Sequence, residues 1–276
     1  MLSATDLKAL LRQHGLRLTK RLGQHYLIDA NVIRRVVDAC ELSGTETVVE
    51  IGAGLGALTE VLASRASTVL AVEVDAKIAD VLEHRLQAQG RVRVLRQDIL
   101  EFRWETTPGA IIVGAIPYQL TSPILAALCE HRVSVRRAVL VMQREVAERL
   151  AARPGTKAYG RLSVLAQYGY TIETVCSIPR GAFFPPPAVE SRCVRLIPRS
   201  SPAVRVDDEA RFFHVVKAAF AHRRKTFVNC LSDPRGGLMA RARAEAIVEK
   251  LGFASDVRGE TLSLEQFAMI ANEVFR

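Results

Sequence analysis

Residues 47–56 read TVVEIGAGLG, an apolar run rich in β-branched residues that passes into glycines at Gly52, Gly54 and Gly56. Three glycines at alternate positions let the backbone turn tightly and approach a ligand without Cβ atoms in the way. The segment ALTEVLASR (57–65) follows and predicts a helix whose N-terminus faces that ligand. The stretch therefore predicts a strand, a glycine turn and a helix, the first unit of a parallel α/β fold.

The glycine spacing and two acidic residues indicate the kind of ligand. The spacing is GxGxG, not the GxGxxG of a dinucleotide fingerprint, which favours S-adenosylmethionine over a nicotinamide cofactor. Glu73 ends the apolar run 68–75 and can accept hydrogen bonds from two ribose hydroxyls, while Asp98 ends the run 92–98 and can accept one from an adenine amine. The alternatives are a glycine turn without a ligand and acids that only cap helices.

Further apolar runs alternate with amphipathic segments and extend the pattern along the chain. This alternation predicts a parallel sheet with helices on its faces. Two later runs predict a closing antiparallel hairpin. The additional strand candidates are AIIVGAI (110–116), RRAVLVMQ (136–143), ETVCSIP (173–179) and RCVRLIP (192–198).

The C-terminal part of the chain predicts a second domain. Residues 199–210 are polar, contain proline and lack apolar periodicity, so they are expected to form a linker after a first domain of residues 1–198. Residues 211–276 are expected to form a small all-helical domain. Its three predicted helices cover 210–231, 241–252 and 263–275.

Composition limits the classes of protein. The five cysteines are widely spaced and the six histidines scattered, which argues against a disulfide framework and a zinc site, so no metal is expected. No run approaches the ~18 apolar residues of a membrane span, and residues 1–15 predict a short amphipathic helix and not a secretory signal, so a cytoplasmic protein is expected. The net charge of +9 favours a polyanionic partner, although a merely soluble basic protein is the alternative. Residues 201–276 hold 12 Lys and Arg against 10 Asp and Glu, so most of the excess charge belongs to the larger domain.

The fourth predicted strand runs into GAIPYQLTSP (114–123), which resembles a catalytic loop for adenine amines. An exocyclic amine is a weak nucleophile because its lone pair is delocalised into the ring. A loop of the form (Asn/Asp)-x-Pro-(Tyr/Phe) holds the amine with a side-chain acceptor and a backbone carbonyl, and stacks the extruded base on its aromatic ring. In this chain the carbonyl is that of Ile116, followed by Pro117, and the ring is that of Tyr118. Ala115 supplies no side-chain acceptor.

These motifs together resemble one family. From about residue 16 to its C-terminus the chain is similar to the small-subunit ribosomal RNA adenine dimethyltransferases of the KsgA type. The resemblance implies a Rossmann-like class I methyltransferase sheet with a small C-terminal all-helical domain, and S-adenosyl-L-methionine as cofactor. Besides the glycine loop it is carried by KRLGQHYLID (20–29), VEVD (72–75), QDIL (97–100), IPY (116–118), MQREVAERLAARPGTKAYGRLSVLAQ (142–167), IPRGAFFPPPAVESRCVRL (178–196) and KAAFAHRRKTFVNCL (217–231).

The resemblance also implies roles for individual residues. Phe183 matches the aromatic residue that sandwiches the target adenine against the Tyr118 position, with a core aromatic residue as the alternative. The family has Asn where this chain has Ala115, so one acceptor for the target amine is missing. The implied cofactor positions are Gln24, His25, Leu27, Gly52, Ala53, Gly54, Gly56, Glu73, Val74, Asp98, Ile99 and Ala115.

Two basic clusters are expected to contact RNA phosphates. They are Arg17, Lys20 and Arg21 before the glycine loop, and Arg223, Arg224 and Lys225 in the helical domain. Each cluster alone is commonly a solvated face. The resemblance implies action on the small ribosomal subunit and its rRNA during assembly. The sequence does not indicate an oligomeric state, so a monomer is the default expectation, and no membrane or DNA partner is expected.

Three functions follow from this reading. The first is dimethylation of two adjacent adenosines near the 3′ end of small-subunit rRNA, impaired by Ala115. The second is an assembly factor that binds cofactor and subunit with little or no catalysis. The third is methylation of large-subunit rRNA, as in the related enzymes of macrolide resistance, although the segment 154–167 and the helical domain favour the small-subunit group.

Overall fold

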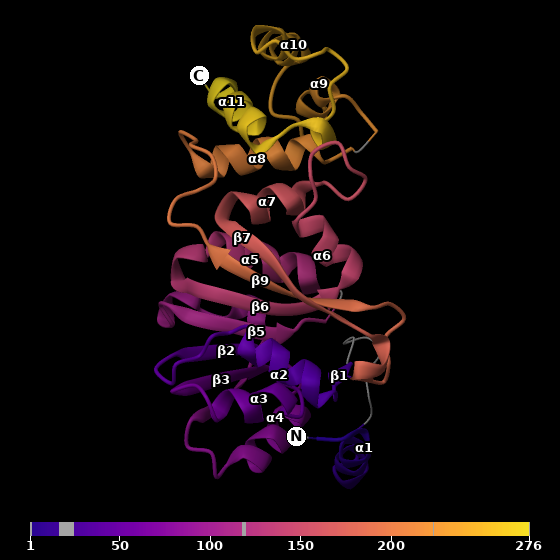
Figure 1. Ribbon diagram of the computed structural model, residues 1–276. Helices are drawn as coiled ribbons and strands as arrows, with labels where there is room; N and C mark the ends of the chain where they lie inside the picture. The colour runs from indigo at the N-terminus through magenta and orange to yellow at the C-terminus, as the bar shows by residue number, and fades with distance from the viewer. Residues whose placement is uncertain (1, 17–24, 118–119, 223, 276) are drawn as a thin grey trace. The chain divides into compact units, whose positions relative to one another are not determined.

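The computed structural model describes residues 2–16, 25–117, 120–222 and 224–275. Its contacts divide the chain into two compact units. The first comprises Met1–Ala147 and Thr171–Pro198, and the second comprises Glu148–Tyr170 and Arg199–Arg276. The elements of both units can be followed in Figure 1.

The first unit is built on a seven-stranded sheet of order β4-β3-β2-β5-β6-β9-β7. Strands β2 to β6 run parallel to their neighbours, and β9 is antiparallel to β6. This arrangement confirms the predicted α/β fold with a mostly parallel sheet. The strands are β2 (Thr47–Ile51), β3 (Thr68–Glu73), β4 (Val92–Arg96), β5 (Ala110–Ala115), β6 (Val135–Gln143), β7 (Tyr170–Ile178) and β9 (Ser191–Pro198).

Apolar side chains of the central strands form the core of this unit. Val48 and Val69, on neighbouring strands, pack in one buried cluster with Leu58 and Leu62 of a covering helix. Burial of these side chains is the main favourable contribution to folding. The helices of the first unit are α1 (Ala4–Gln13), α2 (Ala30–Asp38), α3 (Ala57–Ala63), α4 (Ala76–Leu86), α5 (Thr121–Glu130) and the first half of α6 (Arg144–Leu150).

A small two-stranded sheet brings the N-terminal region beside a distant loop. β1 (Tyr26–Leu27) pairs antiparallel with β8 (Phe183–Phe184). His25 Nδ1 lies 2.7 Å from the carbonyl oxygen of Pro185, a second link between the two segments. Leu7 and Leu11 of α1 are buried with Leu55 from the glycine loop. These contacts place the N-terminal segment next to the turn that follows β2.

The second unit is helical around an aromatic core. The Tyr168 and Phe212 rings stack with centroids 5.0 Å apart, and Phe227 meets Phe267 edge to face at 6.4 Å. The buried Tyr159 hydroxyl donates a hydrogen bond to the carbonyl of Leu262 at 2.9 Å. The helices are α7 (Arg161–Gly169), α8 (Glu209–Ala219), α9 (Phe227–Leu231), α10 (Arg241–Lys250) and α11 (Leu264–Val274).

This division differs from the predicted domain boundaries in one segment. Residues 148–170 were expected in the first domain, but they belong to the second unit. The reason is apolar packing, because Tyr159, Val164 and Tyr168 are buried in the same cluster as Phe212. The patterned sequence shows that α7 is amphipathic but not which neighbour covers its apolar side.

The helix predicted for residues 210–231 is also corrected. It is two helices, α8 and α9, separated by the basic segment. Thr226 begins α9 as its N-cap, because its hydroxyl accepts a hydrogen bond from the Asn229 amide. Apolar residues on both sides of the break maintain a helical spacing, so periodicity alone predicts one continuous helix.

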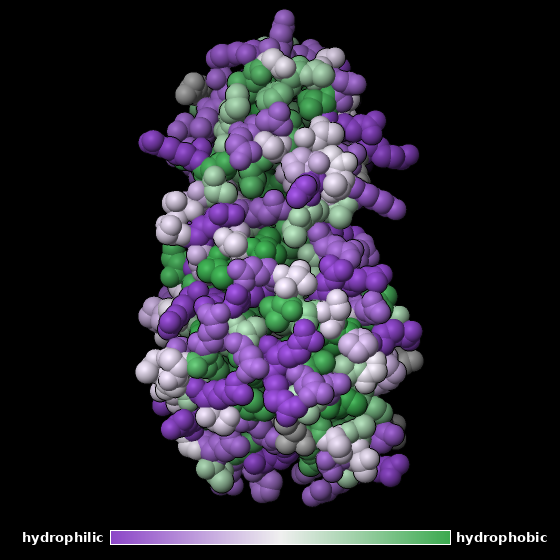
Figure 2. All heavy atoms as spheres, viewed as in Figure 1, coloured by the Kyte–Doolittle hydropathy of each residue, from purple (hydrophilic) through white to green (hydrophobic). Residues whose placement is uncertain are grey.

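Hydrophilic side chains dominate the surface seen in Figure 2, with smaller hydrophobic areas between them. Within the described residues, no helix has the length and apolar composition needed to cross a membrane.

Candidate functional site

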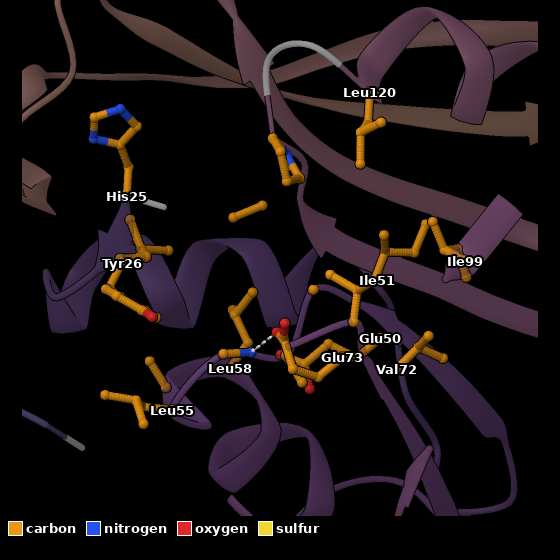
Figure 3. A pocket seen from close by; sticks show the side chains of 18 of the residues that line it. His25, Tyr26, Glu50, Ile51, Leu55, Leu58, Val72, Glu73, Ile99 and Leu120 are labelled. Atoms are coloured by element: carbon orange, nitrogen blue, oxygen red, sulfur yellow. Dashed lines mark hydrogen bonds between the residues drawn. The ribbon is translucent and has the colours of Figure 1, made fainter. Parts of the chain in front are cut away.

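Several predicted residues meet in a hollow at the carboxyl ends of the parallel strands. Parallel strands end at the same edge of a sheet, which is where open α/β folds bind ligands. The empty volume there is about 1040 Å³, including the part open to solvent. The predicted residues that line it are His25, Leu27, Gly52, Ala53, Gly54, Glu73, Val74, Asp98, Ile99, Ala115 and Pro117. Figure 3 shows the hollow with Glu50 and Glu73 next to each other.

The turn after β2 requires glycine for two separate reasons. Gly54 has a φ of +56°, in the left-handed region that disfavours other residues. A Cβ atom on Gly54 would also lie 2.8 Å from the Tyr26 ring. Gly56 has a φ of +88° and its Cβ would lie 2.6 Å from a Leu82 methyl group, so it serves packing and does not line the hollow.

Glu73 ties the glycine turn to the end of β3. Its carboxylate accepts hydrogen bonds from the Gly54 amide at 2.9 Å and the Asp75 amide at 3.0 Å. The side chain is buried, and burial raises its pKa, while these two hydrogen bonds act in the opposite direction. The same carboxylate lines the hollow, so it both holds the turn and borders the space open to a ligand.

Asp98 follows β4 and begins a short 3₁₀ helix, Ile99–Glu101. Its side chain accepts a hydrogen bond from the Leu100 amide at 2.9 Å. Asp98 is therefore a helix cap, as the alternative interpretation proposed, and it lines the hollow as well. Val74 is 53% exposed, which leaves an apolar side chain uncovered between Glu73 and Asp98 along the rim.

The turn after β5 contributes Ala115 and Pro117 to the hollow. Ile116 is buried, and its amide donates to the Val141 carbonyl at 3.0 Å, which anchors the turn to β6. The Pro117 carbonyl accepts a hydrogen bond from the Leu120 amide at 2.9 Å. Tyr118 and Gln24 both lie outside the described residues.

Phe183 does not line the hollow. Its side chain is 4% exposed and packs in the core cluster next to Leu27, its partner in the small sheet. The neighbouring Phe184 is only half-buried, and Lys8 Nζ lies 5.1 Å from the centroid of its ring. The structure thus places Phe183 in the position expected of a core aromatic residue, and its role in stacking stays a prediction.

The basic clusters fall partly outside the described residues, which exclude Arg17, Lys20, Arg21 and Arg223. Arg224 is exposed. Lys225 Nζ donates to the Asp233 carboxylate at 2.8 Å, and His222 Nε2 lies 3.0 Å from the same carboxylate. Asp233 therefore links the side chains of His222 and Lys225, on the segment between α8 and α9.

Sequence patterns missed part of the lining. Leu7 comes from the N-terminal helix α1 and Leu2 from the residues just before it, and no motif connects either to the site. Glu50 lies in residues 47–56, where a single acidic residue interrupts an apolar strand. That interruption was the signal that could have indicated a functional carboxyl group. The remaining unpredicted lining residues are Tyr26, Ile51, Leu55, Ala57, Leu58, Val72, Gln97 and Leu120.

Comparison with known proteins identifies the family. The family model described as ribosomal RNA adenine dimethylase matches residues 15–275. This chain belongs to that family. Two relatives named ribosomal RNA small subunit methyltransferase A agree with this: the Geobacillus sp. protein is 43% identical, and the Bacillus cereus protein 42% identical. Each alignment covers 96% of this chain and 94% of the relative.

Two solved structures share the fold of this chain. A dimethyladenosine transferase from Plasmodium falciparum matches with a TM-score of 0.74 at 24% identity, over 89% of this chain and 96% of that one. The 23S rRNA methyltransferase ErmE matches with a TM-score of 0.67 at 27% identity, over 91% of this chain and 100% of that one. The rRNA adenine dimethylase family thus shares its class I methyltransferase fold with an enzyme named for the other ribosomal subunit.

Proposed function

We propose that this chain is an S-adenosylmethionine-dependent enzyme that dimethylates the exocyclic amines of two adjacent adenosines near the 3′ end of small-subunit rRNA. The observation that carries the proposal is the hollow that joins the glycine turn, Glu73 and Asp98 to the turn containing Ala115 and Pro117. The two relatives named small-subunit methyltransferases support the choice of rRNA.

The lining residues fit S-adenosylmethionine. The Gly54 position leaves no space for a Cβ and so offers bare backbone to the ligand. Glu73 and Asp98 present carboxylates at the ends of adjacent strands, suited to ribose hydroxyls and an adenine amine. Val74, Ile99 and Leu58 supply apolar contacts for the adenine ring and the methionine chain. When bound, S-adenosylmethionine supplies a methyl group activated by a sulfonium.

The turn after β5 is proposed to hold the target base. The Ile116 amide anchors the backbone of this turn, and the Ile116 carbonyl is proposed to accept a hydrogen bond from the target amine. Tyr118 and Phe183 are proposed to stack on the two faces of the extruded base. Movement of strand β8 would be needed to expose Phe183, because its side chain is buried.

Ala115 favours a second candidate function. It lacks the side-chain acceptor that Asn provides in the family, and loss of one such group costs ~10²–10³ in rate, or roughly 3–4 kcal/mol. A chain that binds cofactor and small subunit but transfers methyl groups slowly would act mainly as an assembly factor. The anchored Ile116 carbonyl favours residual catalysis.

The likeness to ErmE makes large-subunit rRNA the alternative substrate. The greater identity to relatives named for the small subunit favours small-subunit rRNA. The net charge of +9 suits an RNA partner, with Arg224 and Lys225 as proposed phosphate contacts in the helical unit. We place the enzyme in the cytoplasm as a monomer, where it meets the assembling subunit.

The test is methyl incorporation from labelled S-adenosylmethionine. Unmethylated small subunits and, separately, large-subunit rRNA are incubated with the protein, digested and analysed for dimethyladenosine by mass spectrometry. The proposal predicts label in two adjacent adenosines near the 3′ end of small-subunit rRNA. Binding to the small subunit without label supports the assembly factor, and label only in large-subunit rRNA supports the ErmE-like function.

A further inference from the structure

Glu50 is a buried carboxylic acid on the wall of the hollow. It is the penultimate residue of β2, its side chain is 1% exposed, and it lines the same pocket as Glu73. Its Oε2 atom has no hydrogen-bond partner within the described chain. An unpartnered buried carboxylate is costly, because burial removes the water that stabilises its charge.

The groups that face Glu50 do not compensate a negative charge. Glu73 on β3 disfavours it by like-charge repulsion, and Thr59 on α3 partly favours it. Thr59 Oγ1 nevertheless makes no hydrogen bond of good geometry within the described residues, so it stabilises a negative charge on Glu50 only weakly. Cys40 lies after α2, and burial is the main cause that raises the pKa of its thiol. Repulsion from Glu50 raises that pKa further. On the β5 side, Glu50 is paired in register with the apolar Val113.

These surroundings keep Glu50 neutral at physiological pH. Burial is the largest cause and, with repulsion from Glu73, raises the pKa of Glu50 to about 8. Glu73 differs because two backbone amides stabilise its charge. The hollow therefore holds one carboxylate satisfied by the backbone and one carboxylic acid that lacks a counter-charge.

We infer that Glu50 compensates charge in the cofactor site: it holds a proton while the site contains no cation, and releases it when a cationic group of the cofactor binds. This inference rests on the proposed identity of the cofactor. The O–H bond of the carboxylic acid breaks, its electron pair stays on the carboxylate, and the proton passes to the solvent. The cation is the sulfonium or the α-ammonium group of S-adenosylmethionine, and three ligands distinguish the two.

Charge compensation gives the site a preference among related ligands. A sulfonium cation is present in the methyl donor and absent from the demethylated product, S-adenosylhomocysteine. If the sulfonium causes Glu50 to lose its proton, the negatively charged carboxylate binds the donor more tightly than the product at neutral pH. Conversion of the bound donor to the bound product is then accompanied by uptake of a proton at Glu50.

Isothermal titration calorimetry in two buffers of different ionisation enthalpy measures this proton. The ligands are S-adenosylmethionine, S-adenosylhomocysteine and uncharged 5′-methylthioadenosine. At pH 7 we expect S-adenosylmethionine to release close to one proton, because the pKa of free Glu50 is about 8. As pH rises towards 8, the Kd for S-adenosylmethionine should fall by up to about tenfold per pH unit, and above pH 8 it should stay constant. 5′-Methylthioadenosine should release none.

The other ligands and two variants assign the proton. Release with S-adenosylhomocysteine equal to that with the donor identifies the ammonium group, and release with the donor alone identifies the sulfonium. Glu50→Gln should abolish the release, whereas Glu101→Gln, at an exposed carboxyl group on the 3₁₀ helix after Asp98, should retain it. As a readout that needs no variant, the infrared band of a protonated carboxyl group should disappear when the donor binds to the wild-type protein.

Three results would overturn the inference. The first is tight binding of S-adenosylmethionine without proton release, which would leave the proposed methyl transfer intact. The second is release that persists in Glu50→Gln or occurs equally with 5′-methylthioadenosine. The third is no binding of S-adenosylmethionine at all, which would overturn the proposed function with it.

Discussion

Ala115 is the residue that most affects activity in this account. It ends β5 and lines the hollow, so a longer polar side chain there would face the ligands directly. Alanine leaves the fold intact because the turn is held by backbone hydrogen bonds from Ile116 and Leu120. A loss at this position is therefore a loss of transition-state stabilisation and not of folding free energy.

Gly54 is expected to be intolerant of even one methyl group. Gly54→Ala would force alanine into a left-handed conformation, at a cost of roughly 1–2 kcal/mol, and bring Cβ within 2.8 Å of the Tyr26 ring. We expect at least about a tenfold increase in the Kd for S-adenosylmethionine, measured by calorimetry. Gly90→Ala is the control, since its Cβ meets nothing within 4 Å, and its Kd should match the wild type. If Gly54→Ala and Gly90→Ala bound S-adenosylmethionine with equal Kd, the proposed close approach of the cofactor to the Gly54 backbone would be contradicted.

Glu50 also links stability to pH. Its pKa is raised from 4.5 to about 8 in the folded protein, so the unfolded chain releases the proton first as pH rises. The contribution of Glu50 to the free energy of unfolding is thus full below pH 4.5 and is lost as pH rises towards 8. Urea unfolding across this range should show a decline for the wild type and for Glu101→Gln that is absent in Glu50→Gln. Parallel curves for all three proteins would show that Glu50 is ionised throughout.

At the scale of single elements, the break between α8 and α9 determines where the basic residues proposed to contact RNA lie. It places His222, Arg224 and Lys225 in a turn instead of on a helix face. The Asp233 side chain is 8% exposed and accepts hydrogen bonds from Lys225 and from the Arg235 amide. The basic turn is thereby fixed by one carboxylate from the following loop.

Asp233→Asn should loosen this turn. Lys225 is the main cause that lowers the pKa of Asp233 from 3.8 to about 2, so the stabilisation exists above pH 3.8 and is lost as pH falls towards 2. We expect a lower Tm for Asp233→Asn at pH 7 and a smaller difference from the wild type at pH 2, by calorimetry. Asp256→Asn, at an exposed carboxyl group, should melt like the wild type. A Tm unchanged by Asp233→Asn would mean that the ion pair is not stabilising.

The same elements show how much the sequence could predict. Strands β2 to β6 could be predicted from short apolar runs, because a buried strand shows its burial in the apolar character of its own few residues. The assignment of 148–170 to the second unit and the helix break did not follow, since both depend on tertiary packing and on a cap at Thr226. At the site, motif residues such as Glu73 and Asp98 were predictable, whereas Tyr26 reaches the glycine turn only through the pairing of β1 with β8.

For the molecule as a whole, the excess of positive charge is the property expected to attract an RNA partner. Most of the net charge of +9 lies in residues 1–200, so many weak phosphate contacts from that part of the chain are expected to contribute to affinity. Such binding weakens as salt rises, because released counterions drive it.

Arg224→Ala should reduce the salt dependence of small-subunit binding. If Arg224 contacts one phosphate, the slope of log K against log salt concentration falls by about 1. Filter binding or surface plasmon resonance at several salt concentrations measures the slope. Arg93→Ala removes an exposed arginine from β4 and should leave the slope unchanged. Identical slopes for wild type and Arg224→Ala would exclude Arg224 from the RNA contact.

The most direct test of the account is the single-turnover rate of methyl transfer to unmethylated small subunits, compared between the wild type and Ala115→Asn. We expect both proteins to produce dimethyladenosine at the same two adjacent sites, with Ala115→Asn faster by ~10²–10³. Their Kd values for S-adenosylmethionine should differ far less than their rates. Equal rates, or no methyl transfer by either protein, would contradict the proposed role of this hollow and of the turn after β5.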